Sequence, residues 1–257
     1  MPQLTNYYFD LFHRDVEPIV PGSNRWGVQG EYVIDSEHFG YTNWVCDEEV
    51  QSVVPNGEDV VLHIVSADVL LDMDVVANSV EIGEEAILNI IDSHSLQIDD
   101  CFTLNGLISV YNNGRLTNAG DTALQLNGMG MLNLSGDGTS GYLGTAENRG
   151  AFTIGKDLTV TTLGYSTGNI YANLTNAGTI TTKAGDLSLN GNTIENIGSI
   201  VTGGEAITLQ NATVNGGTLD GANGFLRLNG ATINNGTLTG NLLASGETST
   251  LNHVTVD

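Results

Sequence analysis

The chain has 257 residues and is strongly acidic, with a formal net charge of −23. A chain with this much negative charge repels phosphate backbones and anionic lipid headgroups. We therefore expect no nucleic acid partner and no membrane insertion. Its apolar runs are too short for a membrane span, and its 33 glycines disfavour long helices. Most acidic residues lie before residue 107, and we interpret them mainly as a means of solubility.

Residues 1–57 differ in composition from the rest of the chain. They contain both tryptophans, Trp26 and Trp44, half of the tyrosines and all four prolines. We predict an N-terminal cap that covers the open strand edges at the start of the repeats that follow. A carbohydrate-binding platform of aromatic side chains is the alternative, although large aromatics are more often core residues.

Residues 58–257 form the second predicted unit, a rod of short apolar-x-apolar segments separated by Gly, Asn and Asp. The alternation runs upstream from Val75 to Val110. Residues 136–150 interrupt it, and we expect them to leave the rod as a loop. The string LTNAG occurs at Leu116–Gly120 and again at Leu174–Gly178, a gap that we interpret as three periods of roughly 19 residues.

The C-terminal repeats align into columns with a period of roughly 19–20 residues. Alternation at period two points the apolar side chains inward and the Thr, Ser, Asn or Arg between them outward. Three such columns recur: Leu187/Leu189, Ile207/Leu209 and Leu226/Leu228; then Leu174, Ile194, Val214 and Ile233; then Ile180, Ile200, Leu219 and Leu238.

Three short strands and three corners per repeat predict an all-β fold, a parallel β-helix with three faces. Gly and Asn supply the positive-φ corners. The drift in period favours the right-handed form, and the chain has room for roughly ten coils. Asn176 and Asn196 occupy matching positions, so we expect their amides to hydrogen-bond along the rod.

Two stretches resemble a known group of proteins. PNGEDVVLHIVSADVLLDMDVVANSVEIGEEAILNI (55–90) is similar to the start of the β-helix in bacterial surface proteins. LTNAGTITTKAGDLSLNGNTIENIGSI (174–200) resembles the repeats of filamentous-haemagglutinin-like adhesins and autotransporter passengers. The resemblance implies secretion or surface display, with adhesion, fibre building or, less often, carbohydrate cleavage as the function.

The leading functional hypothesis is a non-enzymatic structural or adhesive rod outside the cell or on its surface. Its partners would be a cell-surface or glycan ligand and further copies stacked end to end. Residues 242–257 still have the pattern of a coil, which fits either a piece of a longer rod or an end that stacks on the next molecule.

The alternative is a polysaccharide lyase or glycoside hydrolase that acts on an outer face. Hydrolysis needs two carboxylates about 5–9.5 Å apart, and Asp186 with Glu205 is the best pair. Both stand at corners, where turn-forming acids are expected anyway. A lyase needs a basic residue, and Arg227 is the one on a clear strand, between Thr208 and Ser188 of the neighbouring coils; as a structural residue it is a solvated outward side chain.

Metal, redox and ice-binding hypotheses have weaker support. The sequence predicts no catalytic, cofactor or metal residues, although weak calcium binding is open at the acids Asp72, Asp74, Asp99, Asp100 and Asp137. Cys46 and Cys101 are the only cysteines, and a disulfide between cap and rod stays open. Ice binding needs a persistent file of Thr, and the sequence predicts that the file after Thr179 does not persist.

Overall fold

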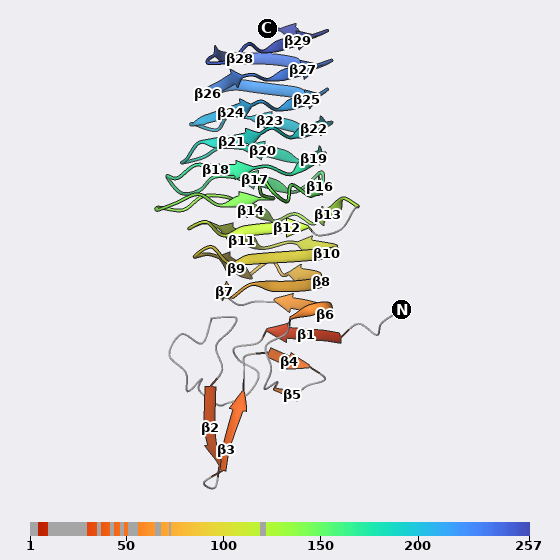
Figure 1. Ribbon diagram of the computed structural model, residues 1–257, viewed down its shortest axis with the longest axis vertical. Helices are drawn as coiled ribbons and strands as arrows, with labels where there is room; N and C mark the ends of the chain where they lie inside the picture. The colour runs from red at the N-terminus through yellow and green to blue at the C-terminus, as the bar shows by residue number, and fades with distance from the viewer. Residues whose placement is uncertain are drawn as a thin grey trace.

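The computed structural model describes residues 56–257 except 65–67, 72 and 119–121, together with the backbone of five N-terminal strands. Its described residues contain no helix, and their strands stack as a parallel β-solenoid of about 9 turns (Figure 1). The predicted fold class is therefore confirmed, with slightly fewer turns than the ten coils expected from the sequence.

The solenoid has three sides, because strands pair in parallel with the strand one full coil further along the chain. β11 pairs with β14, β14 with β17, and β17 with β20. We call the sides faces A, B and C. Face A contains β7 (Asp68–Leu71), β9 (Ile87–Ile90), β11 (Leu107–Val110), β14 (Met131–Asn133), β17 (Thr159–Thr161), β20 (Thr179–Thr181), β23 (Ser199–Val201) and β30 (Thr255–Val256).

The next two sides follow in chain order. Face B contains β12 (Arg115–Asn118), β15 (Tyr142–Leu143), β18 (Gly168–Ile170), β21 (Leu187–Asn190) and β24 (Ala206–Gln210). Face C contains β13 (Leu124–Asn127), β16 (Ala151–Ile154), β19 (Asn173–Asn176), β22 (Thr193–Asn196), β25 (Thr213–Asn215), β27 (Thr232–Asn234) and β29 (Thr250–Asn252).

Five longer strands continue around a corner from one face to the next. Where a neighbouring strand pairs on both sides of that corner, the pairing register shifts there, for example between Ile98 and Cys101. From face B to face C run β6 (Gly57–Ile64), β8 (Val75–Ile82) and β10 (Ser95–Leu104), and from face A to face B run β26 (Thr218–Asn229) and β28 (Thr237–Ala244).

The N-terminal strands lie at one end of the solenoid (Figure 1). β1 (Thr5–Phe9) pairs in parallel with β6, β4 (Trp44–Cys46) pairs antiparallel with β1, and β5 (Glu49–Val50) with β4. β2 (Gly30–Ile34) and β3 (Glu37–Tyr41) form a separate antiparallel pair. The division into a cap of residues 1–57 and a rod of residues 58–257 stays a prediction, and the aromatic side chains that suggested the cap lie outside the described side chains.

The strand register confirms the three apolar columns. Leu174 pairs with Ile194, Ile194 with Val214, and Val214 with Ile233. These side chains lie in the core, and the upstream apolar positions from Val75 to Val110 do so as well. Burial of this continuous apolar interior is the main force that holds the coils together, at about 25 cal/mol per Å².

Corner residues adopt the left-handed conformation predicted for Gly and Asn. Gly191, Asn211 and Gly230 stand at the same corner of three successive coils, with φ of 59°, 54° and 67°. Asn tolerates this region better than most residues with a Cβ, whereas Gly adopts it freely.

The two LTNAG strings do not occupy equivalent positions, which corrects the sequence-based interpretation. Leu116 lies on face B, where the register joins it to Leu143 and then to Ile170. Leu174 lies on face C, opposite Phe152. The gap between the strings corresponds to two enlarged coils plus one side, because the coils that contain residues 136–150 are longer than those further along.

Residues 136–150 do not simply leave the rod, which corrects a second expectation. Tyr142 and Leu143 form β15, and the Leu143 side chain is fully buried. The end of the segment is fixed by Arg149, whose Nη1 donates to the carbonyl oxygens of Asn190 and Gly191 at 2.9 and 2.8 Å. Instead of the expected loop, the segment contributes a short strand with a buried side chain, flanked by longer corners.

Candidate functional surfaces

Arg227 lies on face B, and the two acids that the enzyme hypothesis singled out stand at the corners before strands of that face, offset by one residue in the register. The register joins Leu187 to Ile207, so Asp186 is level with Ala206, one residue beyond Glu205. The Asp186 Oδ1 accepts a hydrogen bond from the backbone N–H of Ala206 at 2.9 Å. The exposed Glu205 side chain stands at the neighbouring corner.

Arg227 shares the outward file of face B with Thr208 on the neighbouring coil and Ser188 one coil further away. Its side chain is not simply solvated, however, because Nη1 contacts Asp186 Oδ2 at 3.1 Å across two coils. Both oxygens of Asp186 therefore have partners. This ion pair links three coils, and it could not be predicted from the sequence because the two residues are far apart along the chain.

A pair of tyrosines on the same side escaped the sequence analysis. The rings of Tyr142 and Tyr171 stack with their centroids 6.3 Å apart and their planes 24° apart. Tyr142 follows Arg115 in the outward file and precedes Asn169. The pair is hidden in the sequence because Tyr142 belongs to the segment that interrupts the repeat.

The acids at which weak calcium binding was left open do not form a metal-binding group among the described residues. Asp74 Oδ1 accepts from the backbone N–H of Ser95 at 2.8 Å, and Asp99 Oδ1 accepts from the Gln97 amide at 3.3 Å. Asp137 is exposed at the corner after β14, whereas Asp72 lies outside the described residues. In the part of the chain that the structure describes, no three His, Cys, Asp or Glu side chains form a group able to hold a metal ion.

Two further expectations concern the cysteines and the membrane. Cys101 is a free, half-buried cysteine in the outward file of face C, and the side chain of Cys46 lies outside the described residues. The disulfide left open by the sequence is therefore not formed in this structure. Among the residues with described positions, no helix has the length and apolar character needed to cross a membrane.

A continuous file of hydroxyl side chains runs along face A, in which Ser199 interrupts the Thr residues as the sequence predicted. The register joins six consecutive coils in this file, and in the first outward position it meets no residue other than Thr or Ser. The neighbouring outward file does break, at Val201 and Asp220. The members of the continuous file are Thr159, Thr179, Ser199, Thr218, Thr237 and Thr255.

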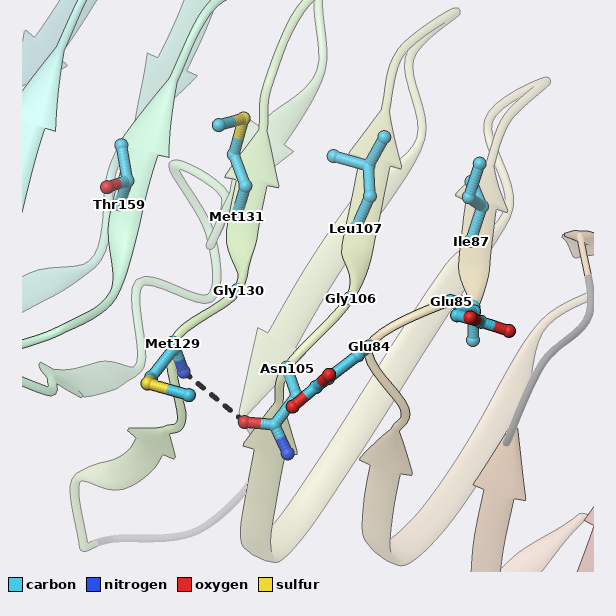
Figure 2. A pocket seen from close by; sticks show the side chains of 11 residues that line it. Glu84, Glu85, Ile87, Asn105, Gly106, Leu107, Met129, Gly130, Met131 and Thr159 are labelled. Carbon is cyan, nitrogen blue, oxygen red and sulfur yellow. Dashed lines mark hydrogen bonds between the residues drawn. The ribbon is translucent and has the colours of Figure 1, made fainter.

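The same file becomes apolar toward the N-terminal end of face A. Ile87, Leu107 and Met131 precede Thr159 on successive coils, and Figure 2 shows the four side chains in a row on neighbouring strands. They border a shallow hollow of about 430 Å³. The corner residue Met129 forms part of its rim and is 69% exposed.

The rim of this hollow is acidic. The exposed Glu84 and Glu85 line it at the corner before β9, and no Lys or Arg is among its lining residues. Asn105 stands at the next corner, where its Oδ1 accepts a hydrogen bond from the backbone N–H of Met129 at 3.3 Å (Figure 2). The sequence alone did not indicate this site, because Ile87, Leu107 and Met131 come together only through the pairing of strands on successive coils.

Comparison of the chain with protein-family models, with curated proteins and with solved structures finds no match in any of the three. The fold and its strand register define the class, a parallel β-solenoid protein. The more specific resemblance to filamentous-haemagglutinin-like adhesins and autotransporter passengers rests on the sequence strings, and it belongs with the proposals that follow.

Proposed function

We propose that this protein is a structural or adhesive β-solenoid rod, displayed outside the cell or on its surface, which acts through its long outer faces. The observation that carries the proposal is the hydroxyl file of face A, from Thr159 to Thr255. It repeats one type of hydrogen-bonding group at intervals of about 4.8 Å. A partner with repeated polar groups, such as a glycan chain, meets several equivalent contacts on such a face and gains avidity from them.

The acidic surface and the resemblance to surface adhesins support the same proposal. A net charge of −23 keeps an elongated molecule soluble and suppresses edge-to-edge association between strands. Association end to end is part of the proposal.

The experiment is binding of the purified chain to a glycan array and to whole cells. The test variant carries Thr179→Val and Thr218→Val in the file of face A. Its matched control carries Thr193→Val and Thr232→Val, which stand in register on face C. We expect the first variant to lose binding and the second to keep it. Blank arrays, blank cells and no self-association would refute the proposal.

Ice binding is a second candidate, and the continuous hydroxyl file is the observation that favours it. A regular array of hydroxyl and methyl groups on a rigid sheet can order a layer of water molecules. The break in the neighbouring file at Val201 and Asp220 restricts that array to one row. Thermal hysteresis of the purified chain would support this candidate, and ordinary freezing behaviour would exclude it.

A further inference from the structure

The hollow on face A has an unusual composition for a solvent-facing surface. Outward positions of a solenoid strand normally carry polar residues, as they do from Thr159 onward in this file. Ile87, Leu107 and Met131 instead present apolar side chains outward on three consecutive coils, and the exposed Met129 extends the apolar surface at the corner. Ile87, Leu107 and Met131 are half-buried; together with the exposed Met129 and a polar border they form a candidate interaction site.

We propose that this hollow binds a basic amphipathic helix of a partner protein. Charge favours such an occupant, since the exposed Glu84 and Glu85 line the hollow and no basic residue does. The exposed Asp68 continues the same file beyond Ile87. A helix with lysine or arginine side chains beside an apolar stripe therefore matches both the acidic rim and the apolar centre of the hollow.

The dimensions favour a helix over an extended segment lying along the rod. Side chains of the file recur at the coil spacing of about 4.8 Å. An apolar stripe on a helix recurs at about 5.4 Å per turn, whereas alternate side chains of a strand recur at about 6.8 Å. Three apolar contacts on Ile87, Leu107 and Met131 thus correspond to two to three turns of an amphipathic helix. The open, shallow form of the hollow also suits a helix that lies across the surface.

The charge of the chain disfavours a second copy of itself as the occupant. Each copy carries a net charge of −23, and most of its acids lie in the part of the chain before residue 107. Bringing that part of one molecule to the acidic rim of another would place like charges together without compensation. Beyond the other end of the hollow, Lys156 lies 3.7 Å from Asp157, so this cation has a partner within its own chain.

The probe is a synthetic peptide of Leu and Lys in which Leu forms one helical stripe, with a Leu and Glu peptide of the same pattern as the reference. Binding of the fluorescent peptides to the full chain is followed by anisotropy at physiological salt. We expect the Leu and Lys peptide to bind and the Leu and Glu peptide not to bind. Leu107→Ser and Met131→Ser should each weaken binding at least about tenfold, because each removes an apolar contact at the centre of the site.

Charge variants separate the site from general attraction to an acidic protein. Glu84→Gln with Glu85→Gln and the control Glu147→Gln with Glu205→Gln change the net charge equally, and all four residues are exposed. The first pair should weaken binding about tenfold, and the control less than about twofold. Met129→Ser, at the exposed rim, gives an independent test if a Leu107 or Met131 variant fails to fold.

Several results would overturn the proposal. They are absence of binding to the Leu and Lys peptide, equal weakening by both pairs of charge variants, and unchanged affinity in every apolar variant. Sedimentation of the chain alone tests the other occupant, a second copy. A dimer that Met129→Ser abolishes would assign the hollow to self-association and would also contradict the proposal.

Discussion

Asn176 donates a hydrogen bond from its Nδ2 to Oδ1 of Asn196, directly above it in the next coil, at 2.8 Å. Both amides are almost fully buried at the corner between faces C and A. Asn196 Nδ2 in turn points to the carbonyl oxygen of Thr218, at 3.4 Å. The predicted amide ladder is therefore confirmed for this pair, and it links three coils through side chains inside the rod.

Asn196→Leu should destabilise the chain by about 1–3 kcal/mol, because it removes the acceptor of the shorter of the two hydrogen bonds that the buried Asn176 Nδ2 donates, the other being to the Ser199 carbonyl oxygen at 3.3 Å. The free energy of unfolding in urea checks this. Asn223→Leu, on an exposed corner, is the control and should change stability by less than about 0.5 kcal/mol. Equal unfolding of the Asn196 variant and the wild type would show that the amide ladder does not contribute to stability.

Ile194→Ala should cost about 2–5 kcal/mol, because it opens a cavity in a fully buried column. Leu209→Ala, in the next column, should behave in the same way. Thr193→Ala, an exposed neighbour on the same strand as Ile194, should be nearly neutral. Thermal unfolding of the variants measures the difference, and a neutral Ile194→Ala would mean that the column is not close-packed.

The pair formed by Asp186 and Arg227 is partly exposed, with side-chain exposures of 35% and 39%. Arg227→Ala should therefore cost no more than about 1 kcal/mol, and less at high salt. Asp186→Ala should cost more, since it also removes the acceptor for the N–H of Ala206. A double-mutant cycle at low and high salt checks both statements; a coupling energy that salt does not change would contradict them.

The enzyme hypothesis makes a separate prediction about the same face. If Asp186 and Glu205 acted as a catalytic pair, the wild type would cleave polysaccharides and Asp186→Asn or Glu205→Gln would abolish cleavage. Our account expects no turnover by any of the three proteins. Release of reducing ends or unsaturated sugars from a panel of acidic and neutral polysaccharides decides the question.

Tyr111 makes stability depend on pH in the alkaline range. Burial raises the pKa of its hydroxyl above the usual value, and the charges of Asp68 and Asp92 add to the effect. Above about pH 10 the unfolded chain loses this proton before the folded chain does, so stability falls as pH rises. Below that range the group is neutral in both states and contributes no pH dependence.

Tyr111→Phe should therefore flatten the alkaline loss of stability and leave the curve near neutral pH parallel to that of the wild type. The phenyl ring is retained against Gly136, which lies in contact with the Tyr111 side chain. Urea unfolding at a series of pH values from neutral to alkaline provides the measurement. The same alkaline slope in both proteins would contradict this assignment.

The fold was predictable because the same residue pattern recurs in each coil. Apolar residues at period two point inward, and Gly or Asn stand at the corners. This pattern places Ile194 and Val214 in the core and Asn211 at a corner. The enlarged coils around Leu143 were not predictable. A repeat pattern cannot indicate where a single strand lies inside an irregular segment. The matching LTNAG strings also suggested that Leu116 and Leu174 are equivalent, whereas the strand register places them on different faces.

The surfaces were less predictable than the core, since they depend on which residues the register brings together. The ion pair between Asp186 and Arg227 spans two coils, and no local sequence pattern indicates it. The hydroxyl file was underestimated, because its two outward positions were judged together although one continues through Thr237 and Thr255. The apolar hollow around Met131 became visible only when outward residues were aligned across coils of unequal length.

Electron microscopy combined with light scattering of the purified chain, over a range of concentrations and with and without millimolar calcium, tests the central claim most directly. Our account predicts elongated particles that grow end to end into unbranched filaments one solenoid wide as the concentration rises. Particles that remain single and compact at every concentration would contradict the proposal that this protein is a fibre-building rod.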